Sequence, residues 1–335
     1  MLKAPFPWFG GKSRASELIW DRFGNVPNYI EPFFGSGAVL LERPHAAHTE
    51  TINDLNCMVA NFWRALQHDP EGVAFYADNP VNEADQHARH LWLCSQADFR
   101  EMMKTDPEYY DSKIAGWWVW GQCIWIGAGW CAKQLPHLGT AGKGLNRQLP
   151  HLGDAGTVGV LEEVECVSDL TSGTPRQVHL LSGPGRGRGI HSGRGQQLLQ
   201  YMRELSQRLR RTRVCCGDWT RILGPSVTFK HGVTGVLLDP PYADTAERTE
   251  DLYSADSVDV AHDVRDWAVT NGENPELRIA LCGYDGEHAM PESWECVTWK
   301  AAGGYGSQGD NAARGNAARE RIWFSPHCIR QVGLF

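Results

Sequence analysis

The sequence lacks the cysteine spacing that usually holds a structural metal ion. It contains 10 cysteines among 335 residues, but no Cys-x-x-Cys pair, and Cys215 and Cys216 are simply adjacent. This spacing does not match the common zinc motifs, and disulfide frameworks are typical of much shorter secreted chains. We therefore expect no metal site and mostly reduced thiols in the core.

Long hydrophobic runs are also missing. No stretch of about 18 apolar residues occurs, and no basic segment followed by an apolar one stands at the N-terminus. These absences predict a soluble, cytoplasmic protein that does not associate with a membrane. The composition, 42% hydrophobic with 14 tryptophans, suffices for a sizeable core.

An excess of positive charge is absent as well, because the net charge is −8. The charges are nevertheless segregated along the chain, and this leaves a polyanionic partner open. Residues 183–213 contain a single acid, Glu204, and eight arginines: Arg186, Arg188, Arg194, Arg203, Arg208, Arg210, Arg211 and Arg213. We expect Arg186, Arg188 and Arg194 to contact phosphates, the alternative being a disordered segment. For the arginines from 208 to 213, a solvated helix face explains the charge equally well.

Strand and helix patterns alternate at both ends of the chain. Strands are expected at 28–33, 49–56, 213–218, 235–242, 277–284, 294–301 and 320–326, and helices at 13–23, 56–69, 82–125, 196–211 and 254–272. Residues 35–44 are expected to form a turn that enters a helix, which Pro44 ends. This alternation predicts an α/β fold with one doubly wound, mostly parallel sheet.

The middle of the chain differs in character and predicts an insertion into that fold. We expect a core of residues 1–70 and 196–335, and a partly helical insertion of residues 71–195. Within the insertion, "QLPHLG" occurs twice, at 134–139 and 148–153, which is fewer than the three copies a solenoid needs. Residues 183–195 are too rich in glycine to pack, and we expect them to be mobile until something binds them.

A glycine loop follows the first expected strand. In "EPFFGSGAVLL" (31–41), Gly35 and Gly37 allow a tight turn and a close approach of a ligand to a helix N-terminus. The loop lacks the third glycine of the dinucleotide fingerprint and the Gly-Lys-Ser/Thr of the Walker motif. Asp54, about 20 residues later, stands where a ribose diol is commonly held. A plain turn and a helix N-cap remain the alternatives, but the pair together indicates an adenosyl cofactor.

Two further stretches carry candidate ligand-binding groups. In "PWFGGKSR" (7–14), Trp8 offers a stacking face, Gly10 a close turn and Lys12 a positive charge. Such a loop could close over a cofactor with an adenine and a carboxylate. In "CGDWT" (216–220), Asp218 could accept a hydrogen bond from an exocyclic amine, or cap a helix.

The stretch "GVLLDPPYAD" (235–244) ends an apolar strand in Asp239, Pro240, Pro241 and Tyr242. The prolines stop strand pairing and stiffen the loop. Asp239 and the Pro240 carbonyl can together accept both N–H groups of a base amine, so that its lone pair faces an incoming methyl group. Tyr242 can stack on a base extracted from a duplex. This chemistry needs positioning and fixed dipoles, with no metal and no covalent intermediate.

The ordered set "PWFGGK", "EPFFGSGAV", "INDLN" and "DPPY" resembles the Dam-like family of DNA adenine methyltransferases, and the overall style is similar to phage or prophage members. The resemblance implies a Rossmann-like fold, S-adenosylmethionine as methyl donor, and a catalytic tetrapeptide from Asp239 to Tyr242. It also implies that residues 71–195 form a target-recognition region for double-stranded DNA. The implied cofactor contacts are Trp8, Gly10, Lys12, Glu31, Phe33, Gly35, Gly37, Asp54, Asp218 and Asp239.

Several alternatives stay open on the sequence alone. The tetrapeptide recognises an amine, so an RNA adenine or the 4-amino group of a DNA cytosine could be the target instead. A non-catalytic DNA-binding module is disfavoured by the intact Asp239, Pro240 and Tyr242. The sequence predicts neither the recognition sequence nor whether the protein is a monomer or a dimer. It also leaves open whether a restriction endonuclease accompanies it.

Overall fold

The computed structural model describes residues 2–8, 10–46, 48–125, 130–131, 181–183, 186–188, 196–242, 259–299 and 319–330. Its strands are β1 (Asn28–Glu31), β2 (Thr49–Asp54), β3 (Leu181–Gly183), β4 (Arg186–Arg188), β5 (Thr212–Cys216), β6 (Thr234–Leu238), β7 (Leu277–Tyr284), β8 (Glu295–Thr298) and β9 (Glu320–Phe324). The helices are α1 (Ser16–Phe23), α2 (Ala38–Leu41), α3 (Cys57–His68), α4 (Pro70–Ala77), α5 (Glu83–Cys94), α6 (Phe99–Thr105), α7 (Ser112–Ile124), α8 (Gln196–Leu209) and α9 (Asp259–Asn271), with short 3₁₀ helices η3 (Trp219–Ile222) and η4 (Phe229–His231).

Seven strands form one sheet in the order β5-β2-β1-β6-β7-β9-β8. The first five are parallel, and β9 and β8 are added antiparallel at one edge. The chain moves outward from β1 through β2 to β5 and then returns to β6 on the other side of β1. Such a reversal opens a crevice at the carboxyl ends of the strands, where α/β sheets bind their ligands. The predicted α/β fold with a parallel-rich sheet is confirmed.

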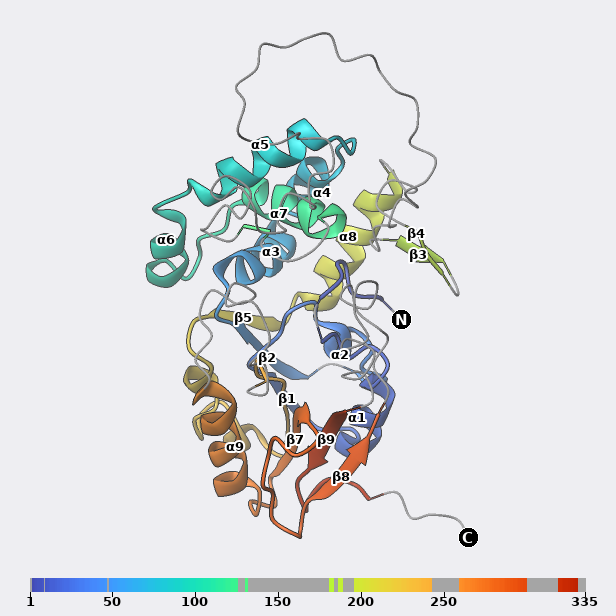
Figure 1. Cartoon of the computed structure of the whole chain (residues 1–335), viewed down its shortest axis with the longest axis vertical. Helices are drawn as coiled ribbons and strands as arrows, with labels where there is room; N and C mark the ends of the chain where they lie inside the picture. Colours follow the sequence, from blue (N-terminus) through green and yellow to red (C-terminus); the bar gives the residue numbers. More distant parts are fainter. Residues whose placement is uncertain are drawn as a thin grey trace, which may run out of the picture.

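Both faces of the sheet are covered, because successive side chains on a strand point to opposite sides. On β6, Leu237 joins the cluster that contains the α1 to α3 side chains, whereas Val236 and Leu238 pack with Val264 of α9. Figure 1 shows α9 on one side of the sheet and α1 and α2 on the other. None of the helices in the described ranges is long and apolar enough to cross a membrane.

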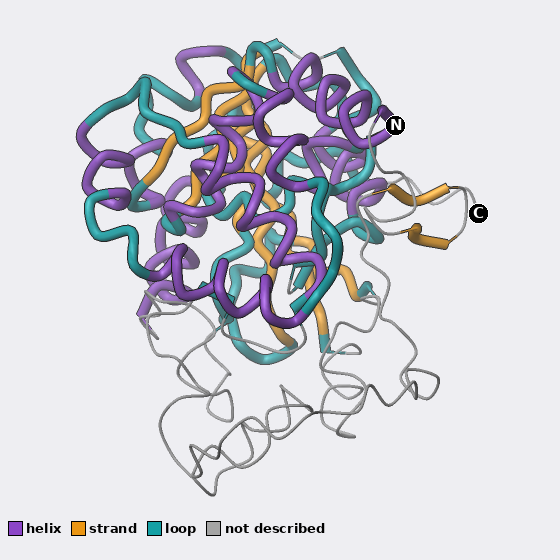
Figure 2. Tube along the Cα trace, turned by 90° about the horizontal axis from the view of Figure 1, so that it is seen from above, coloured by secondary structure: helices purple, strands orange, loops and turns teal. Residues whose placement is uncertain are grey.

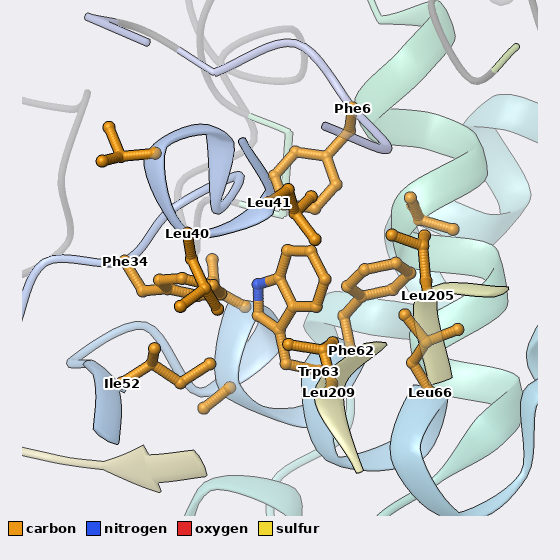
Figure 3. Packing of buried hydrophobic residues seen from close by; sticks show 14 of the residues in the cluster. Phe6, Phe34, Leu40, Leu41, Ile52, Phe62, Trp63, Leu66, Leu205 and Leu209 are labelled. Atoms are coloured by element: carbon orange, nitrogen blue, oxygen red, sulfur yellow. The ribbon is translucent and has the colours of Figure 1, made fainter. Parts of the chain in front are cut away.

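Helices α4 to α8 gather at one end of the molecule, beside α3 (Figure 1). They share a core with the N-terminal segment, whose Phe6 ring lies 5.0 Å from that of Trp118 and 5.4 Å from that of Phe62. Figure 3 shows Phe6, Phe62 and Trp63 packed together with leucines of α2, α3 and α8. Trp118 and Trp120 of α7 are buried and belong to this core. Phe6 therefore anchors the segment that leads into the "PWFGGK" loop.

Strand β6 ends at Leu238, as the apolar run before Asp239 predicted, because Pro240 and Pro241 cannot donate to a neighbouring strand. Within the glycine-rich stretch, Arg186–Arg188 pair antiparallel with Leu181–Gly183 in a separate hairpin (Figure 2). Both "QLPHLG" copies and Arg194 lie outside the described residues.

Candidate active site

The polar residues singled out in the sequence meet at the carboxyl edge of the sheet. Glu31 ends β1, Asp54 ends β2, and Asp239 directly follows β6. Glu320 also lies at this edge, because β9 runs antiparallel and its first residue pairs with Tyr284, the last residue of β7. The topology thus brings together acids that are far apart in the sequence.

Lys12 and Asp239 form a buried ion pair at this edge. Lys12 Nζ lies 2.8 Å from Asp239 Oδ1 and also donates to the Gly10 carbonyl at 2.7 Å. Burial is the largest single influence and would lower the pKa of Lys12, but the charges of Asp239, Cys282 and Glu320 and the hydrogen bond to Asp239 together outweigh it and hold that pKa above its ordinary value. The sequence had suggested Lys12 for a cofactor carboxylate. In the described structure its ammonium group pairs with Asp239.

Tyr242 is tightly held rather than open. Its hydroxyl lies 2.9 Å from Glu320 Oε2 and 3.3 Å from Asp239 Oδ1, and its ring meets that of Tyr284 edge-to-face at 4.6 Å. Only 7% of the residue is exposed, so the expected freely available stacking face is wrong for this conformation. Pro240 is buried and Pro241 half-buried, and the two fix the path of the chain from Asp239 to Tyr242.

The glycine loop packs closely against the N-terminal segment. Gly35 has φ +49°, and a Cβ on it would come within 2.4 Å of Trp8 Nε1. Its carbonyl accepts a hydrogen bond from Trp63 Nε1 of α3 at 3.0 Å. Gly37, with φ +69°, precedes α2. Glycine at position 35 is therefore required both by the backbone angle and by the adjacent indole.

Asp54 supports the same loop. Its carboxylate accepts from the Gly35 N–H at 2.9 Å and from the Asn56 N–H at 2.8 Å. The cap of α3 is Asn56, which accepts from the Met58 N–H, so the N-cap alternative for Asp54 is wrong. Burial raises the pKa of Asp54 to about 6, although the two N–H donors act in the opposite direction.

Glu31 lies between the Asp54 and Asp239 loops. It is 5% exposed and accepts a hydrogen bond from the Tyr29 hydroxyl at 2.8 Å. Burial, reinforced by the charges of Asp239 and Asp54, raises the pKa of Glu31 well above its ordinary value, despite the opposing Tyr29 bond. This carboxyl therefore favours its protonated, hydrogen-bond-donating form more than an exposed glutamate does.

Asp218 is exposed and caps η3 by accepting from the Thr220 N–H at 2.9 Å. This is the capping alternative that the sequence left open. The next residue, Trp219, lies with its ring 6.4 Å from that of Phe33, at 31° between the planes. Leu55, beside Asp54, is 48% exposed. Trp219 and Leu55 are apolar candidates that the sequence reasoning missed, although each directly adjoins a candidate acid.

The arginines singled out in the sequence do not all lie in the same element. Arg186 and Arg188 lie in β4, which belongs to a separate two-stranded sheet. Arg208, left ambiguous by the sequence, makes two hydrogen bonds to Glu50, at 2.7 and 2.9 Å. Within the described ranges no group of three or more His, Cys, Asp or Glu side chains could hold a metal ion.

The site combines an oriented carboxylate, a rigid proline loop and a glycine loop at a topological switch point. Lys12 holds one carboxylate oxygen of Asp239 in place, and the side chain of Asp239 remains 21% exposed. Such a group can accept a hydrogen bond from an incoming amine without needing to reorganise.

One part of the chain matches a known protein family. Residues 8–113 match the D12 class N6 adenine-specific DNA methyltransferase family. No protein in the curated collection matches the chain. The matched range covers less than half of the chain, but it includes the Lys12 loop, the glycine loop and Asp54. The match and the seven-strand sheet together support an adenine-specific DNA methyltransferase with a Rossmann-like α/β fold.

Proposed function

We propose that this protein transfers a methyl group from S-adenosylmethionine to the 6-amino group of an adenine extruded from double-stranded DNA, within a short recognition sequence. The observation that carries the proposal is the convergence of Asp239, Lys12 and Tyr242 beside the Asp54 loop. A single crevice can thus hold a nucleoside donor and a base amine.

The described residues fit the donor. A carboxylate at the end of β2 suits a ribose diol, and the Gly35 loop, closed by Trp8, leaves backbone in place of side chains near the ligand. When bound, S-adenosylmethionine supplies the methyl group. The proposed donor contacts are Trp8, Gly10, Glu31, Phe33, Gly35, Gly37, Asp54, Asp218 and Asp239. Lys12 acts on this site through Asp239.

The proposed role of Asp239 is to accept one N–H of the adenine amine, while the Pro240 carbonyl accepts the other. An amine held in this way directs its lone pair toward the donor. Pro241 restricts the loop, and Tyr242 lies at the base-binding end. Because the Tyr242 ring is packed against Tyr284, stacking on an extruded base requires a displacement of neighbouring atoms.

For DNA recognition we propose the division expected from the sequence, with residues 1–70 and 196–335 as the catalytic core and 71–195 as the target-recognition region. The two regions pack against each other, because α4 contacts α3 and α8, and α7 contacts α3. Arg186, Arg188 and Arg194 are the proposed phosphate contacts.

The direct test is single-molecule sequencing of plasmid DNA from a methylation-deficient host that expresses this protein. Asp239→Ala, which removes the proposed acceptor, serves as the inactive control. Methylated adenines in one short motif with the native chain, and none with the variant, are the expected result. Methylation at nearly every adenine would retain the reaction but refute a specific recognition sequence. Absence of modified adenine with a folded, donor-binding protein would refute the proposal.

A further inference from the structure

Glu320 is a buried acid beside Tyr242. It is 5% exposed, and its Oε2 lies 2.9 Å from the Tyr242 hydroxyl, which is closer than the 3.3 Å to Asp239. A phenol has only one hydrogen to donate. The shorter distance assigns that hydrogen to Glu320 and leaves Asp239 Oδ1 to Lys12.

The segment that carries Glu320 is fixed in place. Glu320 pairs directly with Tyr284 across β7 and β9, and the Arg319 carbonyl accepts from the Asp285 N–H at 2.8 Å. Arg321 lies 2.9 Å from Asp285 in an ion pair. Glu320 and Tyr284 therefore approach Tyr242 from one rigid pair of strands, one at its hydroxyl and the other at its ring.

Packing alone does not account for this arrangement. A tyrosine held only by ring contacts could be a phenylalanine, and burying a carboxylate is costly unless it is hydrogen-bonded. A bond to the hydroxyl, at the far end of the ring, restricts rotation about both side-chain torsions. Glu320, the partner in this bond, is the first residue of β9 and belongs to none of the four sequence motifs.

We propose that Glu320 is a positioning residue, which holds the Tyr242 ring in the orientation that receives the target base and keeps the hydroxyl of Tyr242 off Asp239. The inference rests on the proposed function of Tyr242. It predicts that Glu320 acts on turnover through Tyr242 and has no effect on donor binding.

The test is a double-mutant cycle with Glu320→Ala and Tyr242→Phe, assayed on DNA that contains the mapped target sequence. We expect Glu320→Ala to lower kcat by about 10- to 100-fold with an unchanged Kd for S-adenosylmethionine by calorimetry. Glu320→Gln, whose amide oxygen still accepts from the hydroxyl, should keep most of the activity. In the Tyr242→Phe background, Glu320→Ala should have little further effect.

A second readout reports on the base itself. With 2-aminopurine at the target position, the fluorescence change on binding should differ between the native protein and Glu320→Ala, but not between Tyr242→Phe and the double variant. Multiplicative losses in kcat, or Glu320→Gln as damaging as Glu320→Ala, would overturn the proposal. Should Glu320→Ala fail to fold, Tyr242→Phe is compared with Glu320→Gln: Tyr242→Phe, which removes the same hydrogen bond, should lower kcat, whereas Glu320→Gln should not, and normal kcat in Tyr242→Phe would overturn the proposal.

Tyr242→Ala separates failure of this inference from failure of the proposed site. Full turnover in Tyr242→Ala would refute the proposed function of Tyr242. A large loss in Tyr242→Ala with normal turnover in Glu320→Ala would refute only the positioning role.

Discussion

Lys12 Nζ lies 2.8 Å from Asp239 Oδ1, so a loop near the N-terminus determines how the acid after β6 is presented. Lys12 is 4% exposed and its ammonium group also binds the Gly10 carbonyl. The pair therefore joins the first motif of the sequence to the last.

Replacing Lys12 by methionine should lower kcat rather than donor affinity. Methionine keeps the apolar stem but removes the charge that orients Asp239, and misplacement of a reacting group by about 1 Å can cost about 100-fold in rate. Steady-state kinetics and calorimetry would check this, with Lys12→Arg as the charge-retaining control. A raised Kd for S-adenosylmethionine with normal kcat would instead assign Lys12 to the donor carboxylate.

Donor binding should weaken as the pH falls through about 6. The pKa of Asp54 is raised to about 6 by burial, and a protonated carboxyl loses acceptor capacity for a ribose diol. Calorimetry between pH 5 and pH 8 would measure the change, and in Asp54→Asn the affinity should be lower and independent of pH over this range. Protonation of Asp54 should have the opposite effect on the stability of the fold. Because the folded-state pKa lies above the ordinary value, this group favours folding at low pH, and that contribution is lost as the pH rises from about 4 to 6.

Alanine at position 35 should disrupt the donor site. The backbone angle φ is +49°, which costs a non-glycine residue about 1–2 kcal/mol, and the new Cβ would overlap the Trp8 indole. Reduced donor affinity and a lower Tm are expected. Gly224→Ala is the matched control, because a Cβ there would meet nothing within 4 Å. Equal effects of the two substitutions would contradict the proposed packing.

Glu50→Gln should destabilise the fold strongly. Glu50 is 2% exposed and pairs with Arg43 at 3.0 Å and Arg208 at 2.7 Å. Removing the charge leaves two partly or fully buried guanidinium groups, which should cost about 3–5 kcal/mol in urea unfolding. Arg203→Ala breaks an ion pair whose side chains are 53% exposed, and this control should cost less than about 1 kcal/mol.

Removing Arg186 and Arg188 should weaken DNA binding on every sequence. If each contacts one phosphate, the slope of log K against log salt should fall by about 1 per arginine. Fluorescence anisotropy at several salt concentrations would measure it for Arg186→Ala and Arg188→Ala separately, with Arg203→Ala as the charge-matched control for each. An unchanged slope would remove this hairpin from the DNA interface.

Features that depend on a few neighbouring residues were predictable from the sequence. The apolar run that ends in Asp-Pro-Pro-Tyr marked the end of β6, because proline has no N–H. Gly35 and Gly37 marked a tight strand-to-helix turn, and both have positive φ. The alternation of strands and helices predicted the parallel-rich sheet. Local backbone constraints act over short distances, so the sequence carries them directly.

The sequence by itself thus determined the sheet, the order of the motifs and the residues that carry the chemistry. The tertiary structure decided which of them meet. It paired Lys12 with Asp239, assigned the α3 cap to Asn56 rather than Asp54, buried the Tyr242 ring and brought Glu320 to its hydroxyl. These contacts join segments separated by long stretches of chain. They depend on strand order and on which charges burial forces together, and no local pattern encodes either.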